Sequence, residues 1–183
     1  MNDTENPIAV RSKTIFLESL LSLMKEKNYQ DISISELCKK AGLSRQTFYQ
    51  HYQSKNEVLE KHIDQLCEKF VNMVRYGDVN TVQELAYTFF VYFRQHTAFI
   101  KTLMENDLTG ILSRRFPVYM EQLFDVLGFV KKEVPTYQKK YYFSFVTGAL
   151  VEMLIRWINE KQRCMISELA VLVKDMVSGK LME

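Results

Sequence analysis

A run of hydrogen-bonding side chains occupies residues 45–52, which read Arg, Gln, Thr, Phe, Tyr, Gln, His and Tyr. Only Phe48 in this run is wholly apolar, so a helix made from it is not a core helix. Arg and Gln can each make two hydrogen bonds to the edge of a base, and hydroxyl, phenol and imidazole groups can bind phosphates. The run therefore predicts a helix that lies in the major groove of DNA.

The residues before this run predict the elements that position it. Ser33 and Glu36 fit a capping box at the start of a short helix, and Gly42 fits the left-handed position that ends one. Ser44 can then cap the helix that carries the polar run. Two short helices joined by so tight a turn form a helix-turn-helix.

The net charge of +2 is too small to indicate nucleic-acid binding by itself. A local excess of positive charge lies between residues 33 and 55, where the charged residues are Lys39, Lys40, Arg45 and Lys55 against Glu36. Such charges are often no more than a solvated face. Beside a helix-turn-helix, they favour DNA as the partner.

Composition limits the class of protein. With 183 residues, 47% hydrophobic and 25% charged, the chain is an ordinary globular protein. The three cysteines form no CxxC and the three histidines show no ligand spacing, so we expect no disulfide, metal or cofactor. No GxSxG, P-loop or dinucleotide motif is present, which argues against an enzyme. There is neither a signal core nor a membrane-spanning apolar stretch, so we expect a cytoplasmic protein without membrane contact.

Helical periodicity dominates the chain and predicts an all-α fold of about nine helices. The expected helices cover about 7–28, 33–41, 45–52, 55–76, 80–96, 97–106, 108–127, 136–160 and 166–181. Asn80 is the expected cap of the fifth helix, and Pro117 is expected to kink or break the seventh. We expect a three-helix DNA-binding domain at 1–54 and a larger helical domain for effector binding and dimerisation at 55–183, connected by helix 55–76.

The helix predicted at 136–160 is apolar on two sides. One side carries Phe143, Val146, Leu150, Met153, Leu154 and Trp157, and the other carries Tyr141, Phe145, Gly148, Ala149, Glu152 and Arg156. The last helix adds Leu169, Leu172, Val173, Met176 and Val177. A second copy of the chain is the simplest cover for the second side, in a four-helix interface that makes a homodimer. The alternative is that both sides lie within the chain's own core.

Residues 12–59 resemble the DNA-binding domain of the Tet-repressor family of bacterial regulators. The matching segments are SISELCKKAGLS at 33–44 and TFYQHYQSK at 47–55. The remainder of the chain matches the family only in the number and length of its helices. The resemblance implies a sequence-specific regulator, a repressor that binds a palindromic operator as a dimer.

The resemblance also implies roles for single residues. Phosphate ligands are expected at Ser33, Thr47, Tyr49, His51 and Lys55, and base-reading residues at Ser35, Arg45 and Gln46. Lys55 would lie in the first turn of a helix whose N-terminus favours anions. Many members of the family have a small residue where this chain has Gln46. The simpler interpretation of Ser33 is a helix cap alone, and that of His51 is a surface histidine.

In the family, the larger domain usually binds a small molecule that releases the protein from DNA. Candidate residues for a pocket that takes an apolar or aromatic effector are Phe89, Phe93, Phe99, Leu103, Met104, Tyr119, Phe124 and Tyr142. Aromatic residues at helical spacing are equally compatible with plain core. An alternative function is a helical adaptor, localised on DNA, whose second domain binds a protein partner instead of a metabolite.

Overall fold

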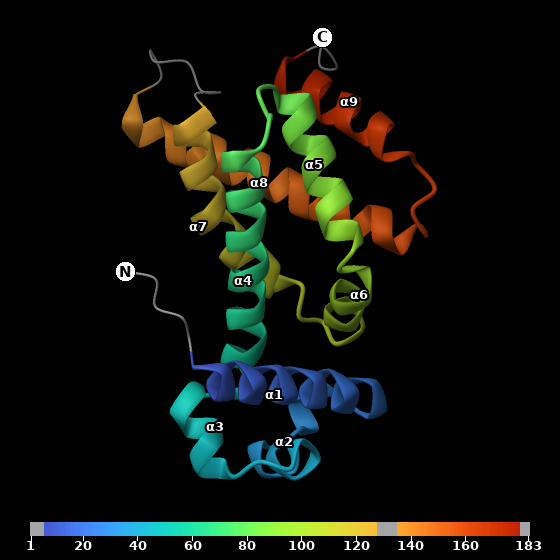
Figure 1. Ribbon diagram of the computed structural model, residues 1–183. Helices are drawn as coiled ribbons and strands as arrows, with labels where there is room; N and C mark the ends of the chain where they lie inside the picture. The colour runs from blue at the N-terminus through green and yellow to red at the C-terminus, as the bar shows by residue number, and fades with distance from the viewer. Residues whose placement is uncertain (1–5, 128–134, 180–183) are drawn as a thin grey trace. The chain divides into compact units, whose positions relative to one another are not determined.

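The computed structural model describes residues 6–127 and 135–179, and within them all regular structure is helical (Figure 1). The α-helices are α1 (Pro7–Glu26), α2 (Ile34–Ala41), α3 (Arg45–His51), α4 (Lys55–Tyr76), α5 (Val82–Arg94), α6 (Thr97–Glu105), α7 (Gly110–Leu127), α8 (Thr136–Asn159) and α9 (Ile166–Val177). A short 3-10 turn, η1 (Tyr29–Asp31), lies between α1 and α2. The predicted all-α class with about nine helices is confirmed.

The structure differs from the expectation in the residue that caps α5 and in the effect of Pro117. Thr81, and not Asn80, caps α5: its hydroxyl accepts from the backbone N–H of Glu84, whose carboxylate accepts in return from the N–H of Thr81. Pro117 lies inside α7 without ending it. The last helix ends at Val177 with Ser178 as its C-cap, before its predicted end near residue 181, which lies outside the described residues.

The chain forms two compact units, Met1–Ile63 and Asp64–Glu183, with α4 running from the first into the second. The expected domain boundary, between residues 54 and 55, assigned all of α4 to the larger domain. The first turns of α4 are tied to the first unit, because Tyr29 donates a hydrogen bond to the side chain of Asn56 and Val58 and Leu59 are buried.

In the first unit, α1 packs on both short helices (Figure 1). Its core holds the fully buried side chains of Phe16, Leu20, Leu37 and Phe48. The rings of Phe16 and Phe48 meet edge to face with centroids 5.3 Å apart, a favourable aromatic geometry. This contact joins α1 to α3 and holds the apolar side of α3 inward, so the polar side of that helix faces solvent.

In the second unit, α5 lies beside α9, and α7 packs on α8 (Figure 1). A cluster of buried phenylalanines, formed by Phe70, Phe89, Phe93 and Phe116, connects α4, α5 and α7. Arg115 of α7 adds a bidentate ion pair to Asp64 of α4, with N–O distances of 2.7 and 2.5 Å. None of the described helices combines the length and the apolarity needed to cross a membrane.

Candidate nucleic-acid interface

Three local caps position the helix-turn-helix. The Ser33 hydroxyl accepts from the backbone N–H of Glu36 at 3.2 Å and starts α2. Gly42 ends α2 at a φ of 64°, a left-handed conformation that glycine adopts without strain. The Ser44 hydroxyl then accepts from the N–H of Thr47 at 3.0 Å and starts α3. The turn between the two helices is therefore specified by residues adjacent in sequence.

The polar run of α3 is divided between two faces. Phe48 lies in the core, and Tyr52, which follows the helix, is also buried. Arg45, Gln46 and Tyr49 are exposed, Tyr49 by 52%. Ser35, the third predicted base-reading residue, is exposed on α2. The structure thus leaves all three predicted base-reading side chains at the surface of the first unit.

Four of the predicted phosphate ligands present polar groups at or near the surface. Ser33 and Tyr49 are exposed, and Thr47 and His51 are half-buried. The hydroxyls of Thr47 and Ser44 lie 2.9 Å apart. The backbone carbonyl of His51 accepts from the ammonium of Lys61 at 2.8 Å, which ties the end of α3 to α4.

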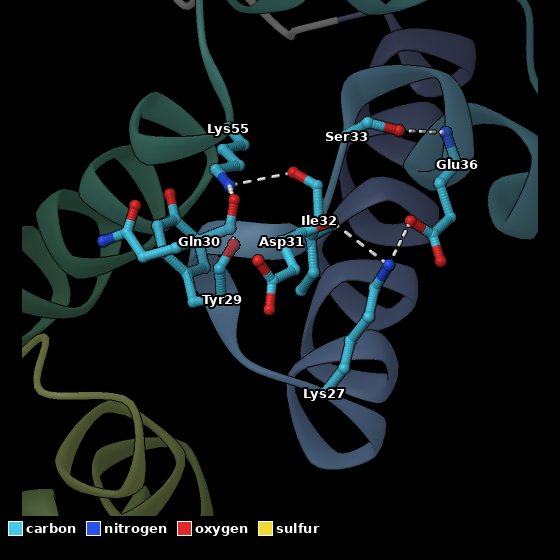
Figure 2. A network of polar contacts seen from close by, with 8 residues as sticks. All are labelled: Lys27, Tyr29, Gln30, Asp31, Ile32, Ser33, Glu36 and Lys55. Carbon is cyan, nitrogen blue, oxygen red and sulfur yellow. Dashed lines mark hydrogen bonds and ion pairs between the residues drawn. The ribbon is translucent and has the colours of Figure 1, made fainter.

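The fifth predicted phosphate ligand, Lys55, has a different environment (Figure 2). Its ammonium donates to the carbonyls of Tyr29, Gln30 and Ile32 at 2.6, 3.1 and 2.8 Å. It also lies 4.4 Å from the centre of the Tyr29 ring. Burial lowers the pKa of Lys55 below its ordinary value.

Two ion pairs link the basic segment to the end of α1, one through its Lys40 and one through its single acid, Glu36. Lys40 pairs with Glu26 at 2.8 Å, and Glu36 pairs with Lys27 at 2.5 Å. Lys39 and Arg45 are exposed on α2 and α3. Arg45 therefore combines exposure, a position in the first turn of α3 and a fixed charge, which suits it to contact DNA.

Lys27 and Lys61 also hold this unit together, although neither was among the residues predicted for it. Lys61 was detectable, because it follows Glu57 at the i,i+4 spacing of helix ion pairs and binds it at 2.9 Å. Lys27 pairs with a residue nine positions away across a turn. A spacing of nine residues across a turn corresponds to neither the helical nor the strand period. This pair therefore becomes apparent only in the folded chain.

In the second unit, the two sides of α8 differ in their burial within the single chain. Phe143, Val146, Leu150, Leu154 and Trp157 are buried on the first side, and Met153 is half-buried. On the second side, Tyr141 and Phe145 are 67% and 64% exposed, Gly148, Glu152 and Arg156 are exposed, and Ala149 is half-buried. The alternative that both sides lie in the chain's own core is wrong. Leu172 and Met176 of α9 are exposed as well.

The predicted effector residues are spread between core and surface. Phe89, Phe93, Phe99 and Leu103 are buried, and the rings of Phe89 and Phe93 are 4.8 Å apart within the phenylalanine cluster. Met104, Tyr119 and Tyr142 are half-buried, and burial raises the pKa of Tyr119 to about 12. The side chain of Phe124 lies outside the described part of the chain.

Surface hollows in the second unit are lined mostly by residues outside the predicted effector set. One of about 330 Å³ is lined by residues of α5, α8 and the start of α9, including Tyr87, Trp157 and Met165. Another, of about 380 Å³, includes Met104 from the predicted set together with Lys101 and Lys161. Across the described residues, no three His, Cys, Asp or Glu side chains gather as a metal site requires.

Two family models match the chain. Residues 16–61 match the model for bacterial regulatory proteins of the tetR family, and residues 80–179 match a model for the C-terminal region of transcriptional regulators. An uncharacterised HTH-type transcriptional regulator of Bacillus subtilis, YxbF, is 33% identical over 64 residues. That alignment spans 34% of this chain and only 17% of YxbF.

Solved structures share the fold over nearly the whole chain. A TetR transcriptional regulator from Streptococcus agalactiae superposes with a TM-score of 0.66 at 24% identity, covering 92% of this chain and 94% of its own. The dihydroxyacetone kinase operon activator DhaS superposes with a TM-score of 0.61 at 18% identity, covering 93% and 96%. Together with the helix-turn-helix geometry and the two matched models, these similarities lead to one conclusion: the chain belongs to the TetR family of DNA-binding transcriptional regulators.

Proposed function

We propose that two copies of this protein bind a palindromic DNA operator, with α3 of each copy in the major groove. The observation that carries the proposal is the exposed polar side of α3, where Arg45, Gln46 and Tyr49 face solvent from a helix whose other side is core. A helix of this kind fits the major groove, and its first residues approach the bases.

Base reading is assigned to Ser35, Arg45 and Gln46. Arg45 can donate two hydrogen bonds to guanine, and Gln46 can pair with adenine. Phosphate binding is assigned to Ser33, Thr47, Tyr49 and His51, whose groups are at or near the surface of the same unit. Lys55 is left out of this set because its ammonium is already bound to backbone carbonyls.

Dimerisation is assigned to the exposed apolar side of α8 together with α9. Tyr141 and Phe145 leave large apolar surfaces in solvent, and Leu172 and Met176 do the same on α9. Two copies of these helices can bury one another's apolar surface in a four-helix interface. Such a dimer would present two α3 helices to half-sites about 34–36 Å apart or somewhat further.

Selection on randomised duplex DNA tests this function. The full-length protein is expected to enrich inverted repeats, and sedimentation of the complex is expected to show two protein chains for each selected site. Enrichment of sites without two-fold symmetry, or a single chain bound to each site, would contradict the palindromic mode. No enrichment at all would contradict sequence-specific reading.

We propose further that occupancy of such a site represses transcription when the site overlaps a promoter. DhaS is an operon activator, so the shared fold is compatible with either direction of control. A reporter gene with the selected operator placed over its promoter tests this direction. Lower expression in the presence of the protein is the expected result, and higher expression would make the protein an activator at that site.

Release by a small apolar or aromatic effector is proposed for the second unit. The support is its abundance of aromatic and methionine side chains, of which Met104, Tyr119 and Tyr142 are only half-buried. A thermal-melt screen with aromatic metabolites tests the proposal, since a ligand of the folded state raises the melting temperature. A compound that raises the melting temperature should also weaken operator binding. Compounds that raise the melting temperature but leave operator binding unchanged would argue against release.

A further inference from the structure

We propose that Lys55 is a positioning residue of the DNA-binding unit, which holds the turn that leads into α2 and does not neutralise a DNA phosphate. The inference rests on the proposed DNA binding and assigns a role within it. Figure 2 shows the central contact, in which the Lys55 ammonium meets three carbonyls of one short turn. An ammonium has three N–H donors, and all three are used here.

A second lysine completes the arrangement from the other side of the turn. Lys27, the C-cap residue of α1, donates to the carbonyl of Asp31 at 3.1 Å and pairs with Glu36 of α2 (Figure 2). The carbonyls of residues 29, 30, 31 and 32 therefore each accept from a lysine ammonium. The carbonyl of Tyr29 also accepts from the backbone N–H of Ile32, and the two lysines supply donors to the carbonyls that follow it in the turn.

The turn controls where α2 begins. Ile32 precedes Ser33, whose hydroxyl caps α2, and Ser35 lies in the first turn of that helix. Tyr29 is buried and donates to Asn56 of α4, so the turn is also fixed by its side chain. A shift of the turn would move Ser33 and Ser35, the two residues of α2 that are assigned to DNA.

The start of α4 offers a poor site for a phosphate. The carboxylate of Glu57 accepts from the backbone N–H of Gln53 at 2.5 Å, and this bond lowers the pKa of Glu57. The carboxylate of Glu57 therefore adds negative charge close to the N-terminus of α4, and this charge disfavours an external anion there. To reach a phosphate, the Lys55 ammonium would give up three hydrogen bonds for one contact.

Two substitutions at Lys55 separate positioning from charge. Lys55→Arg keeps the positive charge, but a planar guanidinium cannot direct its donors at three converging carbonyls as an ammonium does. Lys55→Met removes the N–H donors and keeps an unbranched apolar side chain. Lys39→Met is the matched control, because Lys39 is exposed on α2 within the same basic segment.

The measurements are the melting temperature and the salt dependence of binding to a duplex selected as above. Both Lys55 variants are expected to melt a few degrees lower, by about 2–4 °C. Both should bind about tenfold more weakly, with the slope of log K against log salt unchanged, whereas Lys39→Met should keep the melting temperature. A phosphate role predicts the opposite: Lys55→Arg binds like the parent protein, and Lys55→Met lowers the slope by about one unit for each half-site. That result would overturn the proposal.

A measurement on the unaltered protein decides the question if the variants do not fold. Lysine ammonium protons held in three hydrogen bonds exchange slowly and give an NMR signal in protein labelled with ¹⁵N-lysine. We expect the Lys55 signal in the free protein and an unchanged signal with DNA bound. A signal that moves or disappears when DNA is added would overturn the proposal. A protein that binds no DNA would contradict the proposed function alone, since the melting temperatures and the signal of the free protein would still test positioning.

Discussion

The exposed sides of α3 and α8 are both surfaces left over by core packing, yet their chemistry is opposite. On α3 the exposed residues are Arg45, Gln46 and Tyr49, which carry hydrogen-bond donors and acceptors. On α8 they include Tyr141 and Phe145, which expose large rings. In each helix, the side opposite to these residues packs in the core of its own unit.

The difference indicates two kinds of partner. A polar surface loses little by remaining in water and gains specificity from a partner with matching donors and acceptors, as DNA has. An exposed apolar surface is unfavourable in water, and burial against another apolar surface stabilises it by about 25 cal/mol per Å². This difference supports the two proposed assignments, the α3 surface to DNA and the α8 surface to a second copy of the chain. The two assignments can be tested independently.

The largest effect is expected from Gly148→Leu on α8. Apart from its chain neighbours and the backbone of its own helix, a Cβ atom at Gly148 would meet nothing within 4 Å, so the single chain should fold normally. A leucine there would separate two helices packed across this side, and loss of the dimer should weaken operator binding by about 10²–10⁴-fold.

Sedimentation and gel shift on the same sample measure this effect, with circular dichroism to verify the helical content. Ser113→Leu, a similar change at an exposed position of α7, is the control and should remain dimeric. A Gly148→Leu protein that dimerises and binds normally would place the interface on another surface.

A smaller effect, confined to specificity, is expected from Arg45→Ala. Loss of two hydrogen bonds to one guanine should reduce discrimination at that position by about 1–3 kcal/mol in each half-site. Selection on randomised DNA would then show one relaxed position for each half-site. Gln50→Ala is the control, since Gln50 is exposed on α3 and is not assigned to a base. An unchanged consensus with Arg45→Ala would remove Arg45 from the base-reading set.

Tyr49→Phe should weaken binding to all DNA sequences alike, by about 0.5–1.5 kcal/mol in each half-site, because one hydrogen bond to a phosphate is lost. The slope of log K against log salt should stay the same, since no charge is removed. Titrations at several salt concentrations with selected and unrelated duplexes measure both quantities. Weakening limited to the selected duplex would make Tyr49 a base-reading residue.

The smallest effect, of opposite sign, is expected from Thr147→Val in the core of the second unit. The Thr147 hydroxyl is buried and has no hydrogen-bond partner among the described residues. Replacing a buried, unsatisfied hydroxyl with a methyl group of similar size should raise the free energy of unfolding by about 1 kcal/mol. Thermal melts measure the change. Destabilisation by Thr147→Val would show that the hydroxyl binds a polar partner, such as water or a ligand.

Lys55 and α3 show how far local patterns reach. The boundaries of the short helices at 34–41 and 45–51 follow from caps and a glycine within a few residues, and so does the polar side of α3. The Lys55 ammonium meets carbonyls 23 to 26 residues earlier in the chain, which no local pattern encodes. The resemblance to the family implies that Lys55 binds a phosphate, whereas its contacts support the proposed role of holding the turn before α2.

By itself, the sequence determined the all-α class, the helix-turn-helix and the two-sided character of α8. These features depend on the helical period, on capping and on burial, and all of these act over short distances along the chain. Tertiary structure alone decided which of the polar and charged groups stay exposed. Arg45 faces solvent, while the donors of Lys55 and the carboxylate of Glu36 are bound within the first unit. The physical reason is that a buried carbonyl or charge must find a partner wherever folding places one, and that partner can be remote in sequence.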